Sequence, residues 1–215
     1  MITLDAVSAS SVFTGSTSVQ TWSHVVGSFN NRLLVVGVMG NDPSSDRFVT
    51  GVTYNGDAMT KLVEKDSNYN VTLWYLIAPD TGTHDIVVTH QGGVNSGGAF
   101  GASFYECLQN DFVIGSGNSN GSGHPTVAVS TTIPLSLIVG AFYSNLNGNL
   151  TVDPSQTVIG QSSVNGGSDR VAMSFKVPQG TGSITIDYTG SDTYVGAAGA
   201  FKPIPTGGAV WGFLI

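Results

Sequence analysis

The two halves of the chain carry the same succession of segments, and this internal repeat constrains the fold more than any other feature. Each half contains a buried apolar run, then two strands joined by a Pro/Gly turn, then a strand of small residues. These segments are Leu33–Met39, Val71–Thr83 and Gly101–Phe104 in the first half, and Leu137–Phe142, Val171–Ser183 and Gly199–Phe201 in the second. We align Gly37 with Gly140 and Thr81 with Thr181. The repeat predicts an all-β domain built from two related sets of strands.

Short apolar or alternating runs bounded by turn residues recur along the whole chain, and none keeps a helical period. We therefore predict a jelly-roll-like antiparallel β-sandwich with two sequence-related halves and little helix. A single sandwich over residues 1–205, with pseudo-repeats at about 20–110 and 125–204, is favoured over two tandem domains, because each half has few strong strands to close its own core. In a jelly roll, strands of both halves mix in both sheets. The polar stretch Gly115–Gly123 is then predicted to be a flexible crossing between the halves.

Charged residues make up 10% of the chain, and the formal net charge is −7. Nucleic-acid binding needs clustered Lys and Arg, and the basic residues here form no run. No apolar stretch approaches the length of a membrane span, and the segment that begins at Met1 does not have the pattern of a secretory signal. We expect neither nucleic acid nor membrane as a partner, and a protein that is made and kept in the cytoplasm or released by lysis.

Nothing in the sequence has the spacing of a catalytic, cofactor or metal site. The single cysteine, Cys107, is read as a small buried side chain. The sequence contains no His-Glu-x-x-His or Cys-x-x-Cys motif. With Glu64 and Glu106 as its only glutamates, the chain offers no evident glycosidase pair. We therefore predict no catalytic residue, no cofactor and no enzymatic activity.

Aromatic side chains are the candidates for contact with a sugar, and Trp22 and Trp74 are the obvious choices. Trp74 and Tyr75 point to opposite faces of their strand. Tyr75 aligns with Phe175 of the second half, and an aromatic residue at both positions indicates that Tyr75 and Phe175 lie in the core. Trp74 is thus the better surface candidate of the two, although a role in the core or at an interface is its first interpretation.

The last segment is the sharpest local feature. Pro203 and Pro205 end the final strand because proline cannot donate to a ladder, and two glycines follow. The apolar tail at 206–215 then needs to be covered. It either folds back on its own sandwich or adds to a neighbouring subunit, and the Pro and Gly-Gly hinge favours the second. The predicted assembly contacts are Val210, Trp211, Phe213, Leu214 and Ile215.

Taken together, these segments resemble a β-sandwich module that recurs in phage structural proteins and in bacterial surface proteins. The segments that carry the resemblance are Thr21–Val26, Leu33–Val38, Val52–Thr60, Leu73–Pro79 and Gly196–Phe201. The resemblance implies a non-enzymatic virion protein (capsid decoration or cement, or part of a tail or fibre) that contacts other virion proteins and copies of itself as a homo-oligomer. The alternative is a carbohydrate-binding or adhesive module that recognises a host glycan.

Overall fold

The computed structural model describes residues 1–41, 49–67, 69–146, 148 and 150–205. Within that part of the chain almost every element is a strand, and the only helical element is the 3-10 turn η1 (Asn165–Gly167). No helix in these ranges is long and apolar enough to cross a membrane. The predicted all-β antiparallel sandwich with little helix is confirmed.

The strands of the first half form one sheet in the order β5-β4-β8-β3-β7-β6, and β1 and β2 also pair with β8. Their bounds are β1 (Thr3–Ala9), β2 (Phe13–Val26), β3 (Leu33–Asn41), β4 (Val49–Tyr54), β5 (Asp57–Ala58), β6 (Thr60–Asp66), β7 (Tyr69–Ile77) and β8 (Gly82–Tyr105). β4 and β5 are joined by the two-residue turn Asn55-Gly56, in which both residues have positive φ, as a tight hairpin turn of this kind requires.

The strands of the second half form two further sheets, β13-β14-β11-β16-β9 and β10-β15-β12. Their bounds are β9 (Val113–Gly123), β10 (Thr126–Thr131), β11 (Leu137–Ser144), β12 (Thr151–Val152), β13 (Thr157–Val164), β14 (Asp169–Lys176), β15 (Gly182–Thr189) and β16 (Asp192–Phe201). The expected mixing of strands from both halves in each sheet is wrong, because each described sheet draws its strands from one half alone.

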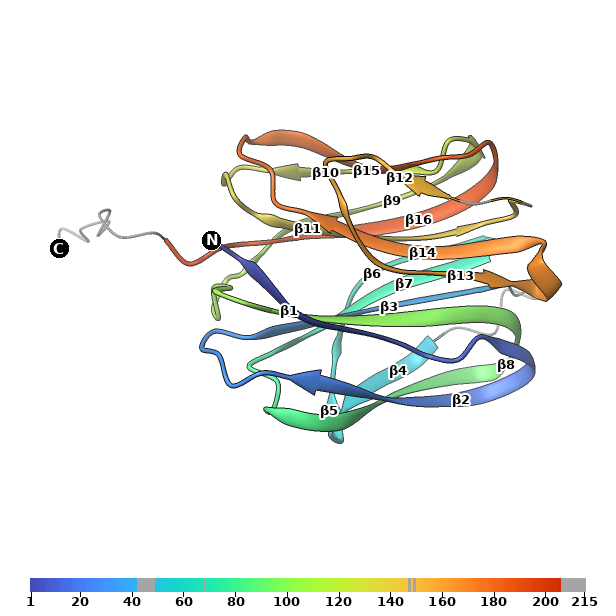
Figure 1. The fold of residues 1–215 in the computed structure, drawn as a ribbon, viewed down its shortest axis with the longest axis horizontal. Coiled ribbons are helices and arrows are strands. Elements are labelled where there is room, and N and C mark those ends of the chain that lie inside the picture. Colours follow the sequence, from blue (N-terminus) through green and yellow to red (C-terminus); the bar gives the residue numbers. More distant parts are fainter. Residues whose placement is uncertain (42–48, 68, 147, 149, 206–215) are drawn as a thin grey trace, which may run out of the picture.

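The strands lie in four layers, an outer and an inner layer in each half (Figure 1). The long strand β8 belongs to both layers of the first half. Its first part pairs with β2 and β4 in the outer layer, and its last part pairs with β1 and β3 in the inner layer. The sequence predicts two separate strands here, His84–His90 and Gly98–Leu108. The second half divides the same path between β15 in its outer layer and β16 in its inner layer.

The two halves have the same strand order. The inner layers read β1-β8-β3-β7-β6 and β9-β16-β11-β14-β13, and the outer layers read β2-β8-β4 and β10-β15-β12. The last inner strand of each half even carries a β-bulge at the same place, between Lys61 and Val63 in β6 and between Val158 and Gly160 in β13. This correspondence explains the sequence repeat.

The predicted flexible crossing Gly115–Gly123 is wrong, because these residues belong to β9, which pairs with β16 along nearly its whole length. β9 is the counterpart of β1. The glycines that suggested a flexible chain allow close approach instead: a Cβ at Gly117 would lie 2.2 Å from the carbonyl oxygen of Ala128.

The alignment of Gly37 with Gly140 is wrong by one residue. Leu33 pairs with Phe104 in the first half and Leu137 pairs with Phe201 in the second, which matches Gly37 to Ala141. Because successive side chains point to opposite faces of a strand, an alignment that is shifted by one residue assigns each side chain to the wrong face. Gly140 faces the outer layer, where a Cβ would lie 2.8 Å from Ile186 Cγ2.

The halves share one core between the inner layers. A Cβ at Gly37 would lie 3.0 Å from Met173 Sδ and 3.4 Å from Leu73 Cδ2, so side chains from both halves converge on this glycine. Two further apolar clusters fill the spaces between the inner and outer layer of each half. Full burial of one large aliphatic side chain contributes about 1.5–3 kcal/mol, so the shared core is a large stabilising contribution.

Candidate functional site

The structure corrects the sequence interpretation of the aromatic candidates. The exposed fractions of Trp22 and Trp74 are 8% and 5%, so neither ring presents a free face to a sugar. The core role that came first for Trp74 is what the structure shows, since its ring packs in the apolar cluster of the first half. The predicted assembly contacts Val210, Trp211, Phe213, Leu214 and Ile215 lie outside the described residues.

Trp22 belongs to a buried polar cluster that the sequence does not reveal. Its indole Nε1–H donates to Ser8 Oγ at 3.0 Å, and the same hydroxyl lies 2.8 Å from His24 Nδ1. His24 is 1% exposed. Beside it, Asp5 accepts hydrogen bonds from the backbone N–H of Gly27 and from the Ser103 hydroxyl, each at 2.8 Å. The cluster ties β1 to β2 across two layers.

The serine beside this histidine does not make a catalytic pair, and the chemistry here favours a structural role. Burial lowers the pKa of His24 to about 4, so the ring stays neutral near pH 7 and is a weak base. The negative charge of Asp5 raises the pKa of His24, but by less than burial lowers it. The Asp5 carboxylate accepts hydrogen bonds from Gly27 and Ser103 rather than orienting the imidazole.

The thiol of the single cysteine is enclosed as well. Cys107 is 1% exposed, as expected for a small core side chain, and burial raises the pKa of its thiol to about 12. Among the described residues, no group of three or more His, Cys, Asp and Glu side chains could hold a metal ion.

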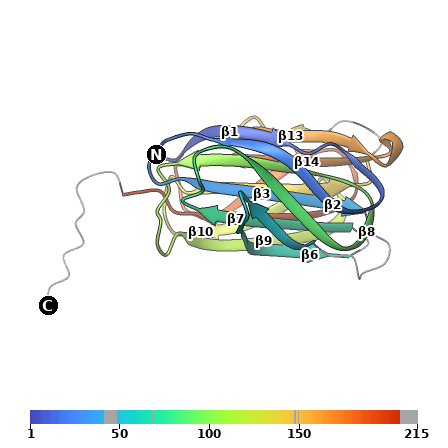
Figure 2. The same cartoon turned by 90° about the horizontal axis from the view of Figure 1, so that it is seen from below.

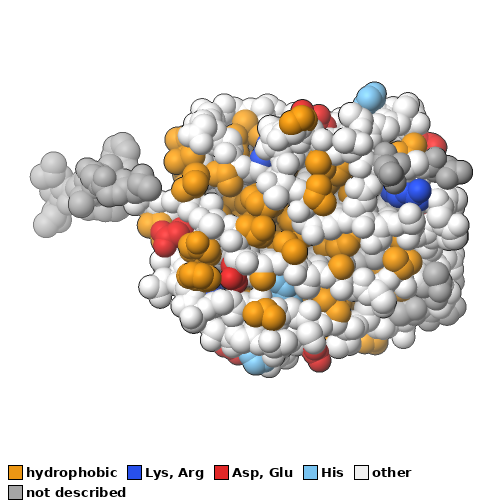
Figure 3. Space-filling view, viewed as in Figure 1, with side chains coloured by type: hydrophobic (Ala, Val, Ile, Leu, Met, Phe, Trp, Pro, Cys, Tyr) orange, Lys and Arg blue, Asp and Glu red, His pale blue; other side chains and the backbone are white. Residues whose placement is uncertain are grey.

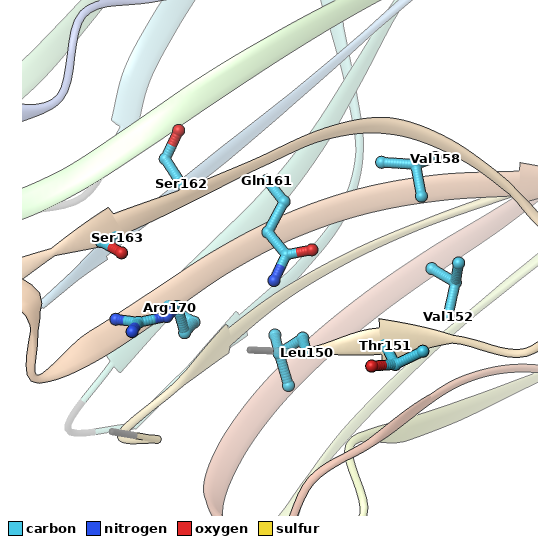
Figure 4. A pocket seen from close by; sticks show the side chains of 8 residues that line it. All are labelled: Leu150, Thr151, Val152, Val158, Gln161, Ser162, Ser163 and Arg170. Carbon is cyan, nitrogen blue, oxygen red and sulfur yellow. The ribbon is translucent and has the colours of Figure 1, made fainter. Parts of the chain in front are cut away.

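An open groove of about 510 Å³ lies between β12 and β13 (Figure 4). Val152 and Val158 face each other across one end. Gln161 and Arg170 lie toward the other end, with Leu150 close to the Gln161 amide. The Arg170 guanidinium is anchored, because Nη1 donates to the carbonyl oxygens of Gly167 and Asp169 at 2.7 and 2.8 Å. The groove therefore offers an apolar end and a fixed cation.

The two halves differ beside the groove, both in the buried residues next to it and in the strands of the outer layer. The Trp74 position is taken by Ser174, whose hydroxyl donates to Gln156 Oε1 at 3.1 Å. The Met59 position is taken by Gln156, and both Ser174 and Gln156 are buried. What the second half lacks is a counterpart of β5: the first half has β5 beside β4, whereas the sheet β10-β15-β12 ends at β12 in the described part of the chain.

The rim of the groove has lost the charges of its counterpart. β6 carries Lys61, Glu64, Lys65 and Asp66. At the matching positions β13 carries Val158, Gln161, Ser162 and Ser163. Charged side chains on an edge strand discourage pairing with other chains, and the sequence of β13 has none. Val158 is 43% exposed, and nothing in the described part of the chain covers it fully.

The surface around the groove is also poor in charge. In Figure 3, hydrophobic side chains are spread among uncharged polar ones over this face, and charged side chains are few. β1 lies on the same side of the molecule as β13, whereas β6 and β9 lie on the opposite side (Figure 2). β1 adds Val7, which is 48% exposed. This side of the sandwich has the character of a contact surface.

No protein-family profile matches the chain. No curated protein matches it, and no solved structure does.

Proposed function

We propose that the protein is a structural component of a phage virion, such as a capsid decoration or cement protein or part of a tail or fibre, and that it acts through subunit contacts. The observation that carries the proposal is the uncharged edge strand β13, with the open groove beside it, at the position where the first half has the charged strand β6.

The chemistry of that edge suits protein association. An unpaired strand edge gives backbone hydrogen bonds to an incoming strand, and the neighbouring pocket selects its side chains. Burial of Val152 and Val158 would add apolar contact area, and the low charge of the face reduces the desolvation cost of a large interface.

The test is mass spectrometry of purified particles of the phage that encodes the chain, together with sedimentation of the isolated protein over a range of concentrations. We expect the protein in the particles at a defined stoichiometry and concentration-dependent association in solution. Particles without the protein would contradict the proposal.

The carbohydrate-binding alternative is supported by a different part of the surface from the one that Trp22 and Trp74 would have formed. A shallow pocket joins Tyr69 at the start of β7 to Asn120 of β9 and Thr193 of β16. The Tyr69 ring is half-buried and stacks on Tyr143 with centroids 4.6 Å apart, so it is held rigidly beside amide and hydroxyl groups. A glycan array with Tyr69→Ala as the control tests this alternative, and a sugar signal that the variant abolishes would favour it.

A further inference from the structure

We infer that the groove beside β12 receives the segment Ala209–Ile215 of a second copy of this chain, which lies there as a strand in the place that β5 takes in the first half. This inference rests on the proposed function and names the partner of the contact surface.

The empty place is defined by the equivalence of the two outer layers. In the first half the order is β2-β8-β4-β5, and in the second it is β10-β15-β12 with no fourth member among the described residues. Residues 153–156 lead directly from β12 into β13, whereas β5 stands between β4 and β6. A strand added beside β12 would therefore complete the layer and lie close to Val158, which lines the same groove.

The segment has the composition that this place requires. Ala209–Ile215 is seven residues long and uncharged, and β13, over which it would lie, has eight residues and no charge. In an extended conformation Trp211, Phe213 and Ile215 fall on one face. That face would pack on Val152 and Val158 at the apolar end of the groove.

The groove also holds a fixed cation, although not at the Lys61 position, which Val158 takes. In the first half Lys61 Nζ lies 5.4 Å from the centroid of the Trp74 ring, a cation–π contact. In the second half Arg170 lines the groove with its guanidinium anchored to backbone carbonyls, and none of the described residues that line the groove is aromatic. Trp211 of the incoming segment would provide that ring.

The end of the described chain favours a second copy as the donor. The chain after β16 is held against the first half: Pro203 forms a bridge with Cys107, and the Ile204 N–H donates to the Glu106 carbonyl oxygen at 3.0 Å. The groove belongs to the second half. The segment thus leaves from one half of its own molecule and would meet the other half of a neighbour.

The experiment uses three full-length variants and analytical ultracentrifugation. Val158→Lys places a lysine where β6 has Lys61, and Trp211→Ser/Phe213→Ser removes the two rings of the segment. Each is expected to weaken self-association by about tenfold or more, as for residues that dominate an interface. The control is Val19→Lys on β2, a valine outside the groove that is somewhat more exposed (52%) than Val158 (43%), and it is expected to leave association unchanged.

Mixing separates a second copy from the same copy as the donor. The Val158→Lys chain keeps an intact segment, and the Trp211→Ser/Phe213→Ser chain keeps an intact groove, so the mixture is expected to recover one contact and form a heterodimer. Failure to recover it, with both variants folded by circular dichroism, would overturn the inference in favour of a segment that covers its own groove. The inference is also overturned if the tail variant associates like the native chain, and the proposed function then stands. A native chain that stays monomeric and is absent from particles overturns both.

Discussion

The two halves of this protein have the same strand order and fill the same place in opposite ways. In the first half, Trp74 and Met59 belong to one apolar cluster, and Lys61 lies over the indole. In the second half, buried Ser174 and Gln156 take their positions and form a small polar pair, and a groove opens beside β12. The difference shows that the strand and turn pattern determines the topology, while a few edge positions decide whether a half is closed or open to a neighbour.

A second contrast lies on the other side of each outer layer. Trp22 and His24 of β2 occupy the positions that Val127 and Val129 occupy in β10, as the pairing with β8 and β15 shows. One half therefore holds a buried polar cluster where the other is purely apolar. Substitutions that remove or exchange the residues in which the halves differ test these contrasts, and those expected to change stability most come first.

Trp74→Ser gives the first half the residue of the second, and we expect it to lower the free energy of unfolding by about 3–5 kcal/mol, because it empties a buried site. It also orphans Thr72, whose hydroxyl accepts the indole N–H at 3.0 Å. Denaturant unfolding measures the loss. Trp74→Phe, which keeps most of the volume, should cost clearly less, and an equal cost for both variants would contradict cavity formation as the cause.

Leu73→Ala and Met173→Ala test the shared core from its two sides. Leu73 and Met173 occupy matching positions and are fully buried, so each truncation is expected to cost about 2–4 kcal/mol. Because both side chains converge on Gly37, the costs in the double variant should not add. We expect one cooperative unfolding transition by calorimetry. Two separate transitions, each shifted by one of the truncations, would show that the halves are independent.

Acid should destabilise the first half through His24. Its pKa is about 4 in the folded protein and about 6.5 when unfolded, so the unfolded state binds the proton more readily. The stability is complete above pH 6.5 and falls as the pH drops toward 4, by about 3 kcal/mol in all. His24→Val, which copies Val129, should flatten this part of the pH profile of unfolding. An unchanged profile would assign the acid sensitivity to other groups.

Lys61→Ala is the mildest change. It removes an exposed ion pair with Glu64 at 2.8 Å and the contact with the Trp74 ring, together about 0.5–1 kcal/mol. Thermal unfolding at low and high salt checks it. Because salt screens the ion pair, the difference between the variant and the native chain should shrink as salt is added.

Much of the fold could be predicted from sequence, because the buried strands of both halves read as apolar runs between turn residues. β9 could not, since its glycines and serines carry no apolar pattern and its pairing with β16 comes from the chain beyond it. The repeat itself was the available signal: a counterpart of β1 had to precede β10. Local pattern also could not separate the faces of Gly37 and Gly140, because a central strand buried on both sides has no alternation to read.

The site was less accessible from sequence. The exchange of Trp74 for Ser174 follows from the sequence alignment of Tyr75 with Phe175. The groove depends on the missing counterpart of β5, which emerges only when the two halves are compared through their strand pairs. Trp22 could not be placed correctly because its partner Ser8 lies on another strand, and a hydrogen bond between strands cannot be read from either segment alone.

The place beside β12 is open once per molecule, because β5 closes its counterpart. Two equivalent open places would let copies join through either half and would allow branching. If segment 209–215 of one copy fills the groove of the next, as we propose, each chain donates one segment and receives one. Contacts of this heterologous kind are directional, and they generate a closed ring or an unbranched filament according to the rotation between successive copies. The two halves of the fold are alike, but an assembly built through one groove per chain would not repeat that likeness.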